Sequence, residues 1–198
     1  MLRQPSGISL GPVLVETERL IIRLADASDV PEIIRYYREN RAHLQPFSPK
    51  FEPELFDPAA WRDQVAARER ELALGESFRA FLFLRSSPER IAGNINLTLV
   101  VRGVSQSCVL GYNLAEAEQG HGYMTEAVRA VVRFAFSDWG LHRVAASYMP
   151  RNERSARVLE RAGFKIEGRA PGYLCINGRW EDHVLTAITN PDPAPSGG

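Results

Sequence analysis

The sequence predicts an α+β (mixed α/β) domain with a mostly antiparallel central sheet, one parallel joint and about four flanking helices. Alternating apolar segments over 78–85, 90–101 and 105–114 are separated only by short turns, which is typical of an antiparallel meander. An amphipathic helix over 123–138 follows a glycine-rich turn. A strand-like segment over 142–149 comes directly after that helix, and a strand–helix–strand unit places its two strands in parallel.

The remaining segments predict the elements around this centre. Alternation over 18–24 indicates a first strand, and apolar positions at near-helical spacing indicate a helix from Asp29 to about Leu44. Asp57-Pro58 is typical of a helix start, and Gly75 ends that helix. The last segments predict a short helix from Asn152 to Gly163, closing strands over 164–167, 173–176 and 180–188, and a hairpin turn at Asn177-Gly178.

Length and composition indicate one globular domain with a substantial core. The chain has 198 residues, 44% of them hydrophobic and 24% charged. Proline- and glycine-containing segments without helical or strand periodicity predict a flexible lead-in over 1–16 and a disordered tail over 190–198, with the domain over 17–189. The formal net charge is +0, so no global basic field attracts nucleic acid or a membrane surface, and an anionic ligand must be held locally.

Cysteine and histidine usage gives no sign of a disulfide framework or a metal site. Cys108 and Cys175 both lie in strand-like segments and are predicted to be buried free thiols in a reducing compartment. The four histidines show no metal-ligand spacing, so no metal is expected. No signal-peptide pattern and no apolar run of membrane-spanning length is present, which predicts a cytoplasmic protein.

The glycine-rich turn Gln119-Gly120-His121-Gly122-Tyr123-Met124 is the main functional signal. It connects a predicted strand to the start of a predicted helix. Backbone N–H groups at a helix start favour anions, and glycine removes the Cβ that would keep a ligand away. The turn therefore predicts a phosphate cradle. A second element, Asn152-Glu153-Arg154-Ser155, starts the helix after the adjoining strand.

Together these motifs resemble the GNAT superfamily of acetyl-CoA-dependent N-acetyltransferases, and in particular its ribosomal-protein-alanine N-acetyltransferase branch. The turn matches the family's pyrophosphate loop, with Met124 in the final small-residue position. The likeness covers most of residues 17–190. Its other motifs are Thr17-Glu18-Arg19-Leu20, Asn40-Arg41-Ala42-His43-Leu44, His142-Arg143-Val144, Asn152-Glu153-Arg154-Ser155, Ala162-Gly163-Phe164, Glu167-Gly168 and 177–183.

The resemblance implies a GNAT fold whose parallel joint is splayed for acetyl-CoA, and direct attack of a neutral amine on the thioester without a covalent enzyme intermediate. A backbone N–H near Asn113 and Leu114 is expected to hold the thioester carbonyl, and Ser155 is the expected catalytic proton donor to the departing thiolate. The alternative for Ser155 is a helix-start serine that bonds only to the local backbone. The expected cofactor-binding residues are Asn113, Leu114, Gln119, Gly120, His121, Gly122, Tyr123, Met124, Thr125, Asn152, Ser155 and Arg157.

No general base stands out in the sequence. Glu116 and Glu118 lie near the cradle but are also ordinary loop carboxylates. Tyr173 or a water-mediated route are the other candidates. His183 is the right residue type, but by the resemblance it is a structural strand residue.

The acceptor implied by the resemblance is the N-terminal α-amine of a protein, in particular a ribosomal protein. Phe47, Phe51, Tyr173 and Trp180 are candidates for the wall of its slot, or for the core. Two alternatives stay open: acetylation of a small molecule such as an aminoglycoside or a polyamine, and a non-catalytic module of the same fold that binds acyl-CoA. Neither nucleic acid nor a membrane is an expected partner.

Overall fold

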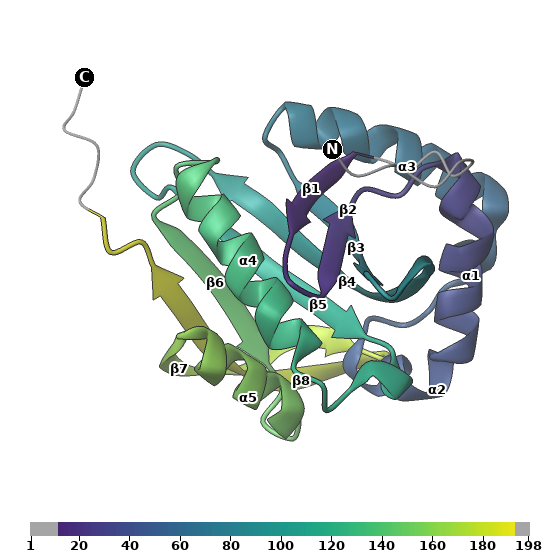
Figure 1. The fold of residues 1–198 in the computed structure, drawn as a ribbon. Coiled ribbons are helices and arrows are strands. Elements are labelled where there is room, and N and C mark those ends of the chain that lie inside the picture. Colours follow the sequence, from purple (N-terminus) through teal and green to yellow (C-terminus); the bar gives the residue numbers. More distant parts are fainter. Residues whose placement is uncertain (1–11, 193–198) are drawn as a thin grey trace.

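A single eight-stranded sheet organises the chain in the computed structural model, which describes residues 12–192 (Figure 1). The strand order is β1-β2-β3-β4-β5-β6-β8-β7, and every neighbouring pair is antiparallel except β5 and β6. This confirms the predicted sheet with one parallel joint. The strands are β1 (Val13–Glu16), β2 (Leu20–Arg23), β3 (Phe78–Leu84), β4 (Ser87–Val101), β5 (Ser107–Leu114), β6 (Arg143–Tyr148), β7 (Lys165–Ile176) and β8 (Arg179–Thr189).

The predicted flexible lead-in is too long at its C-terminal end. Residues 13–16 form β1, which pairs with β2 at the edge of the sheet. A strand of four residues, Val-Leu-Val-Glu, gives little sequence signal, and it is stabilised by its pairing with β2. The rest of the lead-in over 1–11 and most of the expected tail, 193–198, lie outside the described residues.

Five α-helices and four short 3₁₀ turns lie between the strands of the described part of the chain. The helix expected from Asp29 to Leu44 is divided at Asn40, whose side-chain amide bonds back to the carbonyl of Tyr36. Asp57 caps its helix through bonds from the N–H groups of Ala59 and Ala60, as predicted. The elements are η1 (Ala27–Asp29), α1 (Val30–Glu39), α2 (Arg41–Leu44), η2 (Gln45–Phe47), η3 (Pro53–Phe56), α3 (Pro58–Ala73), η4 (Glu116–Glu118), α4 (Tyr123–Ser137) and α5 (Glu153–Ala162).

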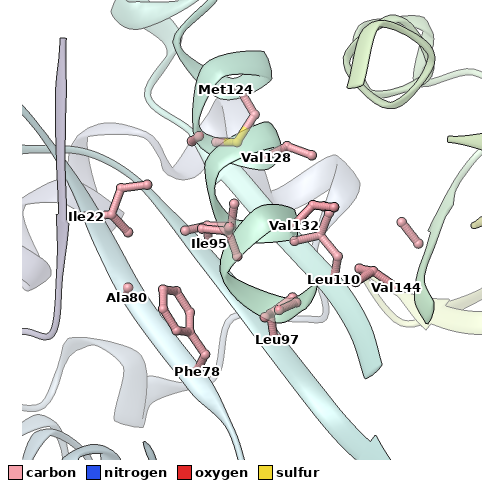
Figure 2. Packing of buried hydrophobic residues seen from close by; sticks show 14 of the residues in the cluster. Ile22, Phe78, Ala80, Ile95, Leu97, Leu110, Met124, Val128, Val132 and Val144 are labelled. Atoms are coloured by element: carbon pink, nitrogen blue, oxygen red, sulfur yellow. The ribbon is translucent and has the colours of Figure 1, made fainter. Parts of the chain in front are cut away.

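Two hydrophobic cores lie on opposite faces of the sheet. In the larger core, α4 directs Met124, Val128 and Val132 onto sheet residues such as Ile95 and Leu110 (Figure 2). Helix α5 packs beside α4 on the same face (Figure 1). The smaller core lies beneath α1 and α3 on the other face, where aromatic residues of these helices meet β3: Tyr36, Tyr37, Trp61, Phe81 and Phe83. Strand alternation thus gives each face its own helices.

The parallel joint between β5 and β6 is short and then opens. The two strands pair only from Ser107↔Arg143 to Val109↔Ala145. Beyond that point β5 stays paired with β4, and β6 stays paired with β8. The edge of β5 over Leu110–Leu114 therefore faces a divergence between two strands, which is where ligands bind in open sheets.

Gly93 of β4 allows the close approach of β5 at this point. A Cβ at residue 93 would lie 2.4 Å from the backbone oxygen of Asn113 and 3.2 Å from the Cα of Leu114. Real Cβ atoms do not approach backbone oxygen so closely, so only glycine fits without moving β5. The end of β5 is fixed by a residue on the neighbouring strand.

The closing segment consists of two long strands. The expected strands at 164–167 and 173–176 are one continuous, bulged strand, β7, because its pairing with β8 resumes after each irregularity. The turn at Asn177-Gly178 is confirmed, with φ values of 47° and 79°. Cys175 is exposed, contrary to the prediction, because β7 is the edge strand and its hairpin with β8 extends from the body of the sheet; Cys108 is buried as expected, and both thiols are free.

Candidate active site

The glycine-rich turn forms an open cradle at the start of α4. Gly120 and Gly122 have φ values of 83° and 81°, in the left-handed region that favours glycine, and Gly122 is the N-cap of α4. A Cβ at Gly120 would meet nothing within 4 Å, so the space beside this residue is free, and a Cβ at Gly122 would lie 3.7 Å from the Arg19 guanidinium. The first N–H groups of α4 point into this space with the positive end of the helix dipole, which suits a phosphate.

One side of the cradle is fastened by three residues that we call the Glu126 latch: Thr17, Arg19 and Glu126. The Glu126 carboxylate accepts hydrogen bonds from the Thr17 hydroxyl (2.6 Å), the Arg19 backbone N–H (3.0 Å) and the Arg19 Nε (2.7 Å). Arg19 also donates to the carbonyl of His121 (2.9 Å) and lies over the ring of Tyr123. Burial alone would raise the pKa of Glu126, but these bonds and the Arg19 charge outweigh burial and lower it.

The other side of the cradle is fastened from α1 and α2. The Asn40 side-chain oxygen accepts a bond from the backbone N–H of Glu116 (2.9 Å), and Nε2 of Gln119 lies 2.8 Å from Nε2 of His43. Gln119 therefore supports the loop by a side-chain contact away from the helix start. The sequence motif containing Asn40 and His43 was part of the family pattern, but its contact with the loop was not predicted.

The start of α5 lies on the opposite side of the divergence. Asn152 caps the helix, with its side-chain oxygen accepting a bond from the N–H of Ser155 (3.1 Å). The Ser155 hydroxyl lies 2.9 Å from the hydroxyl of Tyr112 on β5. Tyr112 was missed by sequence reasoning. Strand alternation puts it on the same face as Leu110, towards α4 and α5. This alternation was the sequence signal that could have placed Tyr112 near Ser155.

Several predicted cofactor-binding residues have side chains that point elsewhere. Asn113 accepts a 2.6 Å bond from the Tyr36 hydroxyl on the α1 face, and Leu114 packs against the larger core. Met124 and Thr125 are buried beneath the start of α4. The side chain of Asn113 is therefore turned away from the divergence, and that of Met124 is buried, so these two residues offer a ligand their backbone. The rings of His121 and Tyr123 stack on each other at the loop surface.

Two arginine-bearing grooves flank the site. Arg157 is paired with Glu153 (3.4 Å) and lines a groove of about 350 Å³ with Arg169 and Tyr148. The groove that reaches the cradle is a different one, of about 510 Å³. It is lined by Thr17, Glu18, Arg19, Gly122, Thr125, Glu126, Arg129, Arg133 and Arg161, and we call it the arginine groove.

A family model for the acetyltransferase (GNAT) domain matches residues 19–165. The chain belongs to the GNAT family. This GNAT protein is 39% identical over 183 residues to the [Ribosomal protein uS5]-alanine N-acetyltransferase of Escherichia coli strain K12, covering 92% of this chain and 94% of that protein. It is 37% identical over 179 residues to the probable N-acetyltransferase YjcK of Bacillus subtilis, covering 90% and 98%. It is an N-acetyltransferase.

Solved structures of GNAT proteins share this fold. The ribosomal-protein-S5-alanine acetyltransferase of Vibrio fischeri superposes with a TM-score of 0.85 at 36% identity, covering 91% of this chain and 98% of that one. RimJ of Mycobacterium smegmatis, solved in complex with CoA-disulfide, gives a TM-score of 0.81 at 27% identity, covering 93% and 90%. Within residues 12–192 of the GNAT protein, no helix is long and apolar enough to cross a membrane, and no group of acidic, histidine and cysteine side chains is arranged to hold a metal ion.

The candidates for a general base occupy different surroundings. Glu116 and Glu118 lie on the short η4 turn beside the cradle. Tyr173 is 46% exposed on β7, with its ring against the edge of His183. His183 is buried, and its Nδ1 lies 2.9 Å from the carbonyl oxygen of Glu181. Within residues 12–192, Glu116 and Glu118 form no ion pair and Tyr173 has no hydrogen bond to a charged side chain, so this geometry fits a water-mediated route equally well.

Proposed function

We propose that this GNAT enzyme transfers the acetyl group of acetyl-CoA to the N-terminal α-amine of a protein, with a ribosomal protein as the acceptor. The observation that carries the proposal is the divergence of β5 from β6 after Val109↔Ala145, with the Gly122 cradle on one side and the Asn152-capped start of α5 on the other. The similarity to the uS5-alanine N-acetyltransferase along nearly the whole chain supports the acceptor class.

The cradle and the divergence fit the pyrophosphate and the pantetheine arm of acetyl-CoA. The diphosphate would accept bonds from the N–H groups around Gly120, Gly122 and Tyr123. The pantetheine arm would run along the edge of β5 over Leu110–Leu114, which β6 leaves unpaired. Amides on such an arm can pair with a strand edge as another strand would. The thioester then lies between Leu114 and Ser155, where a backbone N–H can polarise its carbonyl.

The arginine groove would receive the nucleotide end of the same molecule. It begins at Gly122 in the cradle and continues past Arg129 and Arg133 to Arg161. Within the described chain none of these three arginines forms an ion pair, and Arg129 and Arg133 are one turn apart on α4, so their charges repel. A 3′-phosphate would relieve that repulsion through charge-assisted bonds.

The β7–β8 hairpin and the segment 45–51 would form the lip of the acceptor slot. The Asn177 N–H donates to the carbonyl of Ser48 (3.0 Å), and Arg151 bridges Glu181 and the carbonyl of Pro46. These contacts hold two exposed aromatic side chains on the lip, Phe47 at 40% and Trp180 at 72% exposure. Exposed aromatic side chains of this kind are typical of a surface that binds a peptide.

The test is acetyl transfer to competing acceptors. Purified protein is incubated with acetyl-CoA and one acceptor at a time. The acceptors are N-terminal peptides of ribosomal proteins that begin with alanine or serine, the same peptides with a blocked N-terminus, polyamines and aminoglycosides. We expect release of the CoA thiol only with peptides that have a free α-amine. Mass spectrometry should then show that these peptides carry an acetyl group at the N-terminus. Turnover with polyamines or aminoglycosides but not with peptides would contradict the acceptor. Acetyl-CoA binding without turnover on any amine would contradict the enzymatic proposal.

A further inference from the structure

The hydrogen bond between Tyr112 and Ser155 spans the divergence of the sheet. Tyr112 belongs to β5, three residues beyond the last residue of β5 that pairs with β6. Ser155 belongs to α5, which follows β6. The two hydroxyl oxygens lie 2.9 Å apart, and the Tyr112 hydroxyl lies 3.3 Å from the Ser155 carbonyl oxygen. The contact therefore connects the two chain segments that separate to open the site.

Ser155 is fixed from two directions. Its backbone N–H is bound by Asn152, and its side chain is bound by Tyr112. A tyrosine hydroxyl has one hydrogen, and both of its nearby partners, Oγ and the carbonyl oxygen of Ser155, accept hydrogen bonds. Donation to the nearer oxygen leaves the hydroxyl hydrogen of Ser155 free to point at a third group. An oxygen that accepts one bond also becomes a stronger donor of its own hydrogen.

Burial keeps the Tyr112 hydroxyl protonated, and therefore able to donate a hydrogen bond. Tyr112 is half-buried among residues of the larger core, and burial raises the pKa of its hydroxyl, against a smaller opposite effect of its bond to Ser155. The phenol stays protonated at neutral and mildly basic pH. It can therefore donate a hydrogen bond at the pH values at which the amine of the acceptor is uncharged and reactive. No acidic side chain is bonded to either hydroxyl within residues 12–192.

We propose that Tyr112 is a positioning residue that directs the Ser155 hydroxyl hydrogen towards the sulfur of the leaving thiolate. This rests on the proposed acetyl transfer. In that reaction the N–C bond forms and the C–S bond breaks, and the amine nitrogen loses one proton while the sulfur gains one. Ser155 donates a hydrogen bond to the sulfur as negative charge develops there, and Tyr112 keeps Ser155 in the orientation to do so.

Tyr112→Phe removes only the hydroxyl, and we expect kcat to fall about tenfold with an unchanged KM for acetyl-CoA, the size of effect that one well-placed hydrogen bond has. In a Ser155→Ala background the same change should have no further effect, because the group that Tyr112 orients is gone. Thr189→Val at the end of β8 is the control, since the exposed Thr189 hydroxyl has no hydrogen bond within the described residues and lies outside the site; it should retain wild-type kinetics. A tenfold loss that persists in the Ser155→Ala background, or a rise in KM alone, would overturn the proposal.

A second measurement does not depend on acetyl transfer. In Ser155→Cys, a hydroxyl at Tyr112 stabilises the thiolate of the introduced side chain, so its alkylation by iodoacetamide should extend to lower pH than in Ser155→Cys/Tyr112→Phe. Peptide mass spectrometry separates this thiol from the exposed Cys175. Identical pH profiles in the two variants would contradict the positioning role. A difference in alkylation without amine acetylation by the wild type would support the contact and contradict the proposed function.

Discussion

At the scale of single residues, Gly122 is the N-cap of α4 and has a left-handed backbone conformation that favours glycine. Its φ of 81° disfavours any side chain, and it lies where an anion would approach the start of α4. Gly122→Ala adds strain of about 1 kcal/mol, and Gly122→Glu adds a negative charge to the same strain. We expect Gly122→Ala to weaken acetyl-CoA binding several-fold and Gly122→Glu to abolish it, measured by isothermal titration calorimetry.

Gly140 provides the matched control, because it follows the other end of α4 with a φ of 61° and has nothing within 4 Å of an added Cβ. Gly140→Ala should cost similar stability and leave acetyl-CoA affinity unchanged. If Gly122→Glu binds acetyl-CoA as the wild type does, the turn is not the phosphate cradle.

At the scale of elements, the Glu126 latch connects the turn before β2 to the first turn of α4. The latch depends on an ionised Glu126, whose pKa is lowered in the folded state. Its contribution to stability is complete above the unfolded pKa of about 4.3 and disappears as the pH falls through the lower folded value. Glu126→Gln should therefore reduce stability by about 1 kcal/mol at pH 7, and its melting temperature should converge with that of the wild type towards pH 3.

Thermal unfolding followed by circular dichroism across this range checks the convergence. Glu69→Gln changes an exposed carboxylate on α3 that has no ion pair within the described residues, and it should leave the pH dependence as in the wild type. A constant difference between Glu126→Gln and the wild type at every pH would mean that the latch acts through packing and not through the charge of Glu126.

At the scale of the whole molecule, the formal net charge is zero, so the binding of a charged ligand depends on how the charges are distributed over the surface. Attraction of a polyanionic ligand must come from local excess, and the arginine groove has four arginines and two glutamates. We expect the wild type to bind acetyl-CoA about tenfold more tightly than 3′-dephospho-acetyl-CoA, since one charge-assisted contact contributes about that much. Arg133→Gln should reduce the ratio of the two affinities, acetyl-CoA over 3′-dephospho-acetyl-CoA, to about two.

Competition binding at two salt concentrations measures the ratio, which should decrease at higher salt because the groove is open to solvent. Arg62→Gln, on the exposed face of α3, should leave the ratio unchanged. Equal affinity of the wild type for the two ligands would remove the 3′-phosphate from the arginine groove.

Periodicity and turn chemistry are local properties, and they predicted the parts of the fold that depend on local sequence. The meander, α4, the parallel β6, the Asn152 cap and the Asn177-Gly178 turn were all predicted and are present. The wrong predictions concern features that depend on a partner far away in the sequence. β1 exists because β2 pairs with it, and Cys175 is exposed because β7 has no neighbour on its outer edge.

The sequence by itself determined where the glycine turn before α4 and the Asn152 cap lie and which residue types surround them, because glycines, caps and strand alternation act within a few residues of the chain. Only the tertiary structure decided what those residues touch. It paired Tyr112 with Ser155 across 43 positions and Arg19 with Glu126 across 107, and it placed Arg133, not Arg157, in the groove that reaches the cradle. Such contacts depend on how β5 and β6 diverge and how α4 and α5 pack, so a local sequence pattern cannot predict them.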